Sequence, residues 1–152
     1  MSKSAGVITF QSVSFEYNHQ KPILIEANFV VRHGAKLTLM GQNGAGKSTI
    51  FDLITGVHTP THGTISIQHG TSIAHARQVI PPHLKQVTIE AFFAHCFTEK
   101  VYNLTPKIND VLEIVSLSLP HDKVVSSLSG GQQARLLLAS ALIQNPDVLL
   151  LD

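Results

Sequence analysis

Eight consecutive residues in the first third of the chain have the types and spacing of a phosphate-binding loop. They read Gly41-Gln42-Asn43-Gly44-Ala45-Gly46-Lys47-Ser48, and Thr49 follows. The three glycines allow positive φ angles and a close approach of the backbone to a ligand. The N–H groups of residues 44–49 can then converge on phosphate oxygens at a helix N-terminus, where the helix dipole favours negative charge. Lys47 is suited to contact the β- and γ-phosphates of a nucleotide, and the Ser48 hydroxyl is a hard oxygen ligand for Mg²⁺.

The segments on either side of this loop are those that a phosphate loop needs. Residues 37–40 are apolar and predict a short buried strand that leads into the loop. Residues 47–55 predict a helix, because Ile50, Leu53 and Ile54 share one face and Gly56 stands where a C-terminal cap belongs. The alternative, a chance glycine-rich turn, does not explain why strand, loop and helix follow in this order.

A second glycine motif, Leu128-Ser129-Gly130-Gly131-Gln132, precedes a predicted helix over residues 133–144. Ser129 can cap this helix, and the paired glycines leave its first N–H groups open to a ligand. Taken alone, the motif could equally be a capped helix after a loop. The predicted inward stripe of the helix consists of Ala134, Leu137, Leu138, Ala141 and Leu142.

The other predicted elements supply a sheet and a small helical region. Alternating apolar residues predict strands over residues 7–17, 63–68 and 72–76, and two runs joined through His33-Gly34 predict a hairpin over 28–32 and 36–40. Thr88 is predicted to cap one helix, and Thr105-Pro106 to begin another. The chain closes on an apolar strand, residues 148–151, followed by Asp152.

Composition places the chain among globular proteins. Of its 152 residues 43% are hydrophobic and 14% are charged, the formal net charge is +1, and Lys and Arg are scattered. This argues against disorder and against a basic face that binds nucleic acid. The one cysteine, Cys96, is predicted to pack on a helix. No signal peptide or apolar run of about 18 residues is evident, so we expect a cytoplasmic protein.

Together the two glycine motifs and the apolar strand ending in Asp152 resemble the ATP-binding cassette (ABC) ATPases over essentially the whole chain. The resemblance implies an α/β fold: a P-loop NTPase sheet with an antiparallel β-subdomain and a small helical subdomain at about residues 80–132. It also implies ATP and Mg²⁺ as ligands. On this interpretation residues 1–152 are a partial nucleotide-binding domain whose C-terminal part is missing, because members of the family continue with a catalytic glutamate and a sensor histidine.

The resemblance also assigns roles to single residues. Tyr17 matches the aromatic residue that stacks on adenine, and Gln78 matches the glutamine that contacts Mg²⁺ and the attacking water. Asp152 matches the carboxylate that holds Mg²⁺ together with Ser48, so Gln78 and Lys47 are the catalytic candidates. Residues 128–132 would contact a nucleotide bound on a second cassette, so that two cassettes enclose two nucleotides.

Within this family the sequence that follows Leu128 looks most like the soluble F type, whose members commonly act on ribosomes. The alternative is the ATPase subunit of a membrane transporter, whose membrane domain would dock near residues 78–97. Two activities stay open for the chain itself. One is ATP hydrolysis, which is expected of the complete family member. The other is a nucleotide-binding module without chemistry, which fits the lack of a glutamate after Asp152.

Overall fold

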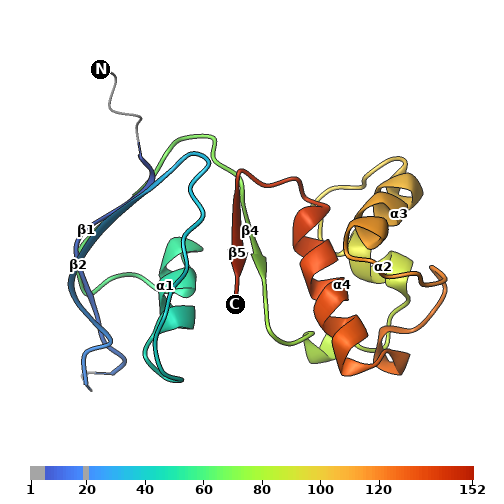
Figure 1. The fold of residues 1–152 in the computed structure, drawn as a ribbon, viewed down its shortest axis with the longest axis horizontal. Helices are drawn as coiled ribbons and strands as arrows, with labels where there is room; N and C mark the ends of the chain where they lie inside the picture. The colour runs from blue at the N-terminus through green and yellow to red at the C-terminus, as the bar shows by residue number, and fades with distance from the viewer. Residues whose placement is uncertain (1–5, 19–20) are drawn as a thin grey trace. The chain divides into compact units, whose positions relative to one another are not determined.

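The computed structural model describes residues 6–18 and 21–152 and divides the chain into two compact units (Figure 1). Residues 1–71 form the N-terminal unit and residues 72–152 the C-terminal unit. The fold is α/β, as the sequence predicted. Its elements are β1 (Gly6–Phe15), β2 (Leu24–Arg32), α1 (Lys47–Ile54), β3 (His62–Ile67), β4 (Ile73–Ala76), η1 (Pro82–Leu84), α2 (Ile89–Ala94), α3 (Leu104–Ile114), η2 (Val125–Ser127), α4 (Gly130–Leu142) and β5 (Val148–Leu151).

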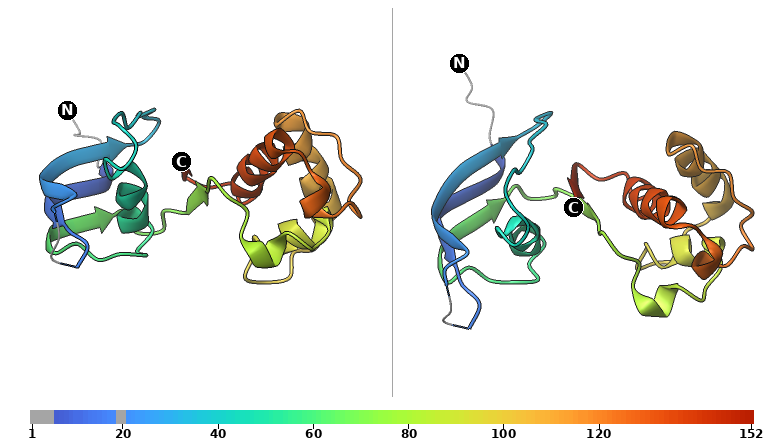
Figure 2. Two further views of the ribbon diagram at one scale, coloured as in Figure 1. Left: turned by 90° about the horizontal axis from the view of Figure 1, so that it is seen from below. Right: turned by 60° about the horizontal axis from the view of Figure 1, so that its bottom comes forward.

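The N-terminal unit is a three-stranded antiparallel sheet with α1 lying beside it (Figure 2). The strand order is β2-β1-β3, which puts β1 in the centre. Phe10 of β1 pairs with Phe29 on one side and Ile65 on the other, and the rings of Phe10 and Phe29 stack with centroids 4.2 Å apart. The core of the unit consists of buried side chains from β1 and α1: Val7, Ile8, Phe10, Val13, Phe15, Leu53 and Ile54.

Strand β1 contains a bulge near its middle. Its pairing with β2 shifts register between Phe10 and Val13, and Ser12 between them has a positive φ of 46°. The Ser12 N–H donates to Asn28 Oδ1 at 2.8 Å, so the bulge is fastened to the neighbouring strand. Burial resumes at Val13 and Phe15, and the chain leaves the sheet just before Tyr17, two residues short of the predicted strand end.

The predicted strand over residues 36–40 is wrong. The turn at His33-Gly34 is present, with the Ala35 N–H donating to Arg32 O at 3.1 Å, but the chain beyond it is irregular. Leu37 is 63% exposed and Met40 is 89% exposed. A strand needs a ladder partner, and among the described residues no strand pairs with this segment. Apolar composition alone therefore did not produce a strand here.

The C-terminal unit is built on two parallel strands, β4 and β5, which pair from Ile73↔Val148 to Ala76↔Leu151. A cluster of hydrogen bonds fastens the start of this pair. The N–H and hydroxyl of Ser72 donate to Asp147 Oδ2 at 2.8 and 2.7 Å, and the Asp147 N–H donates to Ser72 Oγ at 2.9 Å. Because the strands leave this point in register, residues that follow them emerge side by side.

The helices of the C-terminal unit pack around their own apolar core (Figures 1 and 2). Thr88 caps α2 as predicted, its Oγ1 accepting from the Ala91 N–H at 3.2 Å. Burial raises the pKa of the Cys96 thiol to about 11, so this cysteine is a packing residue and not a reactive thiolate. The fully buried members of the core are Ile80, Ile89, Phe93, Ile108, Val125, Leu136 and Ala139.

Two helix predictions need correction. Helix α3 begins at Leu104, after Asn103 in the left-handed conformation, and not at Thr105-Pro106. Proline is tolerated anywhere in a first turn, where its missing N–H has no intrahelical partner, so its position did not fix the start. Helix α4 begins at Gly130 rather than residue 133. It buries Leu136, Ala139 and the following Ile143 while Ala134 is exposed, because it packs both on the helical core and on β4.

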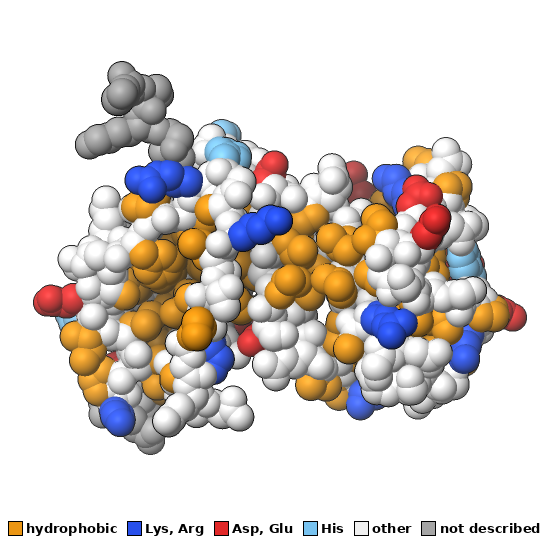
Figure 3. All heavy atoms as spheres, viewed as in Figure 1, with side chains coloured by type: hydrophobic (Ala, Val, Ile, Leu, Met, Phe, Trp, Pro, Cys, Tyr) orange, Lys and Arg blue, Asp and Glu red, His pale blue; other side chains and the backbone are white. Residues whose placement is uncertain are grey.

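The surface agrees with the scattered charge seen in the sequence. On the face drawn in Figure 3, Lys and Arg side chains lie apart from one another and do not gather into a patch. In the part of the chain that the structure describes, no helix has the length and apolar character needed to cross a membrane.

Candidate functional site

The predicted phosphate loop runs from Gly41 into the first turn of α1. Gly44 and Gly46 have φ angles of 81° and 89°, conformations that favour glycine, and the Ala45 N–H donates to Gln42 O at 3.1 Å across the turn. Gly41 does not share the positive φ that was expected of it. It matters for space instead, since a Cβ there would lie 3.2 Å from that of Ala45.

The loop presents a row of free backbone donors. Gly46 is the N-cap of α1 and no side chain caps the helix; the first intrahelical bond runs from the Ile50 N–H to Gly46 O at 3.1 Å. Within the described ranges, the N–H groups of Gly44, Gly46, Lys47 and Ser48 donate to no protein acceptor. Unpaired N–H groups at a helix N-terminus form an anion-binding site, because their partial positive charges point at the ligand.

Lys47 adds a full positive charge to these donors. Its Nζ donates to Gly41 O and Gln42 O, both at 2.9 Å, so the side chain folds back over the loop that precedes it. No carboxylate of the described residues pairs with it, and two carbonyl oxygens leave one of its three N–H donors for another acceptor. The Ser48 side chain beside it is exposed. An anion at the loop would therefore meet an uncompensated cation and a hydroxyl.

Tyr17 and Thr49, both predicted to contact nucleotide, contact each other. Tyr17 Oη and Thr49 Oγ1 form a hydrogen bond of 3.1 Å. Thr49 is 6% exposed and Tyr17 is 38% exposed. The Tyr17 ring also makes edge contacts with Phe15 and His58, at centroid distances of 4.9 and 5.3 Å. Only the backbone N–H of Thr49 is thus left as a candidate phosphate contact, since its side chain faces the protein.

His58 is a member of this aromatic group that the sequence did not single out. Its ring stacks on Phe15 at 5.3 Å in addition to its contact with Tyr17. No pattern in the sequence places it beside residue 17, because that contact comes from the packing of the loop after α1.

Gln78 and Asp152 come together at the far end of the β4–β5 pair. The Asp152 N–H donates to Ala76 O at 3.3 Å, which extends the ladder, and Gln78 Nε2 donates to Asp152 Oδ1 at 3.2 Å. Gln78 Oε1 and Asp152 Oδ2 then remain as oxygen donors on exposed side chains. This set suits Mg²⁺, which takes one or two protein oxygens together with phosphates and water. The described residues hold no cluster of three His, Cys, Asp or Glu side chains that would form a metal cage.

The Leu128–Gln132 motif forms a complete capping box at the start of α4. The Gln132 N–H donates to Ser129 Oγ at 3.3 Å, and the Ser129 N–H donates to Gln132 Oε1 at 3.0 Å. The Leu128 side chain, predicted among the nucleotide contacts, is 5% exposed and lies in the helical core. Gly130 and Gly131 are exposed, and a Cβ on either would meet nothing within 4 Å. The glycines are therefore not needed for packing within this chain.

The capping box makes a stability prediction. Ser129→Ala should lower the free energy of unfolding by about 1 kcal/mol, because it leaves the Gln132 N–H without its partner. Chemical denaturation followed by far-ultraviolet circular dichroism measures this change. Ser126→Ala, which removes an exposed hydroxyl three residues earlier, is the control and should change the free energy of unfolding by less than about 0.5 kcal/mol. Equal effects of the two substitutions would contradict a capping role.

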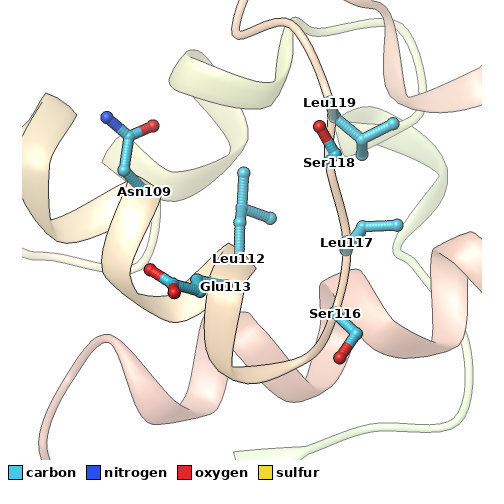
Figure 4. A pocket seen from close by; sticks show the side chains of 7 residues that line it. All are labelled: Asn109, Leu112, Glu113, Ser116, Leu117, Ser118 and Leu119. Atoms are coloured by element: carbon cyan, nitrogen blue, oxygen red, sulfur yellow. The ribbon is translucent and has the colours of Figure 1, made fainter.

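A surface pocket of about 380 Å³ lies at the C-terminal end of α3 (Figure 4). Asn109, Leu112 and Glu113 of α3 line it together with residues 116–119. Asn109 Oδ1 is engaged by His121 Nε2 at 2.8 Å. None of the predicted site residues lines the pocket, so it is separate from the candidate site.

Comparison with known proteins gives the same family as the motifs. The family model described as ABC transporter matches residues 24–152. The spermidine/putrescine import ATP-binding protein PotA of Legionella pneumophila (strain Paris) is 35% identical over 142 residues, which cover 86% of this chain and 39% of PotA. The zinc import ATP-binding protein ZnuC of Rickettsia bellii is 34% identical over 149 residues, 96% of this chain and 61% of ZnuC.

Solved structures agree on the fold. An ABC transporter in an inward-facing conformation matches with a TM-score of 0.81 and 25% identity, over 97% of this chain and 59% of that one. A nucleotide-free ATP-binding cassette from an ABC transporter matches with a TM-score of 0.79, 21% identity, and coverage of 97% and 69%. The chain spans 39–61% of the length of the two curated relatives above. These relatives support the transporter alternative better than the F-type interpretation. Because the family model covers residues 24–152, the chain belongs to the ABC transporter family.

Proposed function

We propose that this chain binds Mg-ATP and serves as the ATP-binding part of a membrane transporter. The observation that carries the proposal is the phosphate loop at the N-terminus of α1. The N–H groups of Gly44, Gly46, Lys47 and Ser48 have no acceptor among the described residues, and the Lys47 ammonium donates to carbonyl oxygens of the same loop. Donors and cation together are what a triphosphate requires. The transporter assignment is supported by relatives whose names describe import ATP-binding proteins.

Within this proposal each group has a physical task. The N–H groups and Lys47 hold the β- and γ-phosphates, and Tyr17 stacks on the base. Ser48, Asp152 and Gln78 hold Mg²⁺ or its water ligands, with Gln78 also orienting the attacking water when ATP is hydrolysed. When bound, Mg²⁺ would neutralise charge on the β- and γ-phosphates. Hydrolysis itself is proposed for the complete transporter, because the chain spans only part of its relatives.

The signature residues are proposed to act on a second copy of the domain. Gly130 and Gly131 leave the start of α4 uncovered by side chains, so a phosphate carried by another cassette could approach it. The partners proposed are thus a second cassette and a membrane domain of the transporter. A ribosomal partner has no support among the relatives described above.

Calorimetric titration of the chain with ATP, with Mg²⁺ and then with EDTA, tests the proposal. We expect saturable binding that weakens when Mg²⁺ is removed. Asp152→Asn should weaken Mg-ATP binding by about tenfold, because contacts that involve a charged group contribute roughly 1.5–3 kcal/mol, and should leave binding in EDTA unchanged. The asparagine keeps an oxygen that accepts from Gln78, so the change is one of charge. Asp110→Asn, on the exposed side of α3, is the control.

Two results would count against the proposal. Absence of any ATP binding by the unsubstituted chain would remove the nucleotide assignment. An Asp152→Asn variant whose ATP affinity responds to Mg²⁺ as strongly as that of the unsubstituted chain would exclude Asp152 from the magnesium site while leaving the phosphate loop in place.

A further inference from the structure

Among the described residues, Thr49 is the one polar residue that is buried. It is the third residue of α1, directly after the lysine and serine of the phosphate loop. Its hydroxyl forms a hydrogen bond of 3.1 Å with Tyr17 Oη. Tyr17 lies 32 positions earlier in the chain, just after β1. A buried hydroxyl without a partner is costly, so this bond ties the end of the sheet to the start of the helix.

The bond also restrains the Tyr17 ring. A tyrosine side chain has two main torsions, and fixing its phenolic oxygen together with ring contacts removes most of the freedom of both. Here Thr49 holds the oxygen, while Phe15 and His58 contact the ring edge-on at 4.9 and 5.3 Å. The ring nevertheless remains 38% exposed, so part of it is open to a ligand.

We propose that Thr49 is a positioning residue that holds the Tyr17 ring ready for the base of the nucleotide. The helix whose N-terminus receives the phosphates then also sets the ring that receives the base. This inference rests on the proposed function. It assigns the Thr49 side chain a task different from phosphate contact: it contributes to recognition of the nucleoside part and contributes nothing to recognition of the phosphates.

The two parts of the ligand can be separated experimentally. ATP carries both base and phosphates, whereas inorganic tripolyphosphate carries the phosphates alone. Loss of the Thr49 hydroxyl should therefore weaken ATP binding and spare tripolyphosphate binding. A purely structural disturbance of α1 would weaken both, because both ligands need the same N–H groups.

The test measures the affinities of ATP and tripolyphosphate, each with Mg²⁺, by isothermal titration calorimetry on the whole chain. Thr49→Val and Tyr17→Phe remove the same hydrogen bond from its two sides. Each should weaken ATP by about three- to tenfold, the range that one net hydrogen bond supports, and change tripolyphosphate by less than twofold. The double variant should be no weaker than either single one, since only one bond is lost.

Two further variants serve as controls. Thr49→Ser keeps the hydroxyl and should restore at least half of the lost ATP affinity. Thr55→Val removes a hydroxyl at the other end of α1, which donates to Phe51 O at 2.9 Å, and should change neither affinity. If Thr49→Val fails to fold, two variants still test the inference. Tyr17→Phe removes the hydrogen bond at the more exposed residue, and Thr49→Ser keeps the hydroxyl at residue 49.

The outcomes distinguish this inference from the proposed function. If the unsubstituted chain binds neither ligand, the proposed function fails and the inference falls with it. If it binds both, and Tyr17→Phe and Thr49→Val leave the ratio of the two affinities unchanged or act additively, the positioning role alone is wrong. Preferential loss of ATP affinity in both variants, without additivity, is the supporting result.

Discussion

Replacement of Lys47 by alanine should weaken the binding of Mg-ATP by at least tenfold. The Lys47 ammonium lies over the loop at 2.9 Å from two of its carbonyl oxygens and has no carboxylate partner among the described residues. A charge-assisted contact with a phosphate contributes roughly 1.5–3 kcal/mol, which corresponds to a factor of about ten to more than a hundred in affinity. Titration calorimetry with Mg-ATP measures the loss directly.

The matched control is Lys36→Ala. Lys36 is exposed and lies five residues before the loop, so the substitution changes the net charge of the same unit by the same amount. It should change the affinity by less than twofold at 0.15 M salt, where exposed charges more than about 8 Å from a ligand are screened. If both variants lose affinity equally, the lysine acts through the general field of the protein, and the phosphate-loop assignment would have to be abandoned.

The phosphate loop and the capping box could be predicted from the local sequence, because the geometry of each is determined within a few residues. A positive φ at Gly44 and Gly46, and the Ser129–Gln132 pair, depend only on residue type and spacing. The same holds for the Thr88 cap of α2. Each of these features could be predicted without knowing what packs against it, and each is present in the structure.

Features that depend on distant partners were harder to predict. Residues 36–40 have the composition of a strand, yet they have no ladder partner among the described residues and are exposed. The inward stripe of α4 was predicted as a single face, whereas contacts on two sides widen it to include Leu136 and Ala139. Periodicity reports one apolar face and cannot report a second neighbour.

The least predictable part of the candidate site is what holds its residues in place. Asp152 was chosen for its position after an apolar strand, but its approach to Gln78 depends on the register of β4 with β5, which Ser72 and Asp147 fasten at the other end. A slip of one residue would move Asp152 by about 3.3 Å along the strand and break its contact with Gln78. The Ser72–Asp147 contact joins residues 75 positions apart, so no local sequence pattern predicts it.

Among the substitutions in the loop, Gly46→Ala should cause the largest loss of stability and of Mg-ATP affinity. The reason is a residue outside the motif, Ile23. Gly46 has a φ of 89°, and a Cβ placed on it would collide with Cγ2 of Ile23. The left-handed backbone costs a residue with a Cβ about 1–2 kcal/mol, and the overlap adds about 1–3 kcal/mol. We expect the free energy of unfolding to fall by about 2–5 kcal/mol and Mg-ATP binding to fall below detection. Denaturant unfolding and calorimetry measure the two effects.

Gly44→Ala separates the two causes. Gly44 has a similar φ of 81°, but a Cβ there would meet nothing within 4 Å, so only the backbone cost of about 1–2 kcal/mol applies. Ile23→Ala combined with Gly46→Ala removes the methyl group that collides, and the double variant should recover part of both stability and ATP affinity. A Gly46→Ala variant as stable as Gly44→Ala would show that the Ile23 side chain simply moves aside.

This outcome bears on how the loop is held. The Ile23 N–H donates to Phe15 O at 2.9 Å, which anchors Ile23 at the end of β1, where the chain continues to Tyr17. Ile23 against Gly46 and Tyr17 against Thr49 are therefore two contacts that join the same strand end to the loop and to the helix after it. If both contacts hold, an alanine at residue 46 must displace either the strand end or the N–H groups that we propose as phosphate donors. Recovery of ATP binding in the Ile23→Ala background would show that the displaced part is the loop.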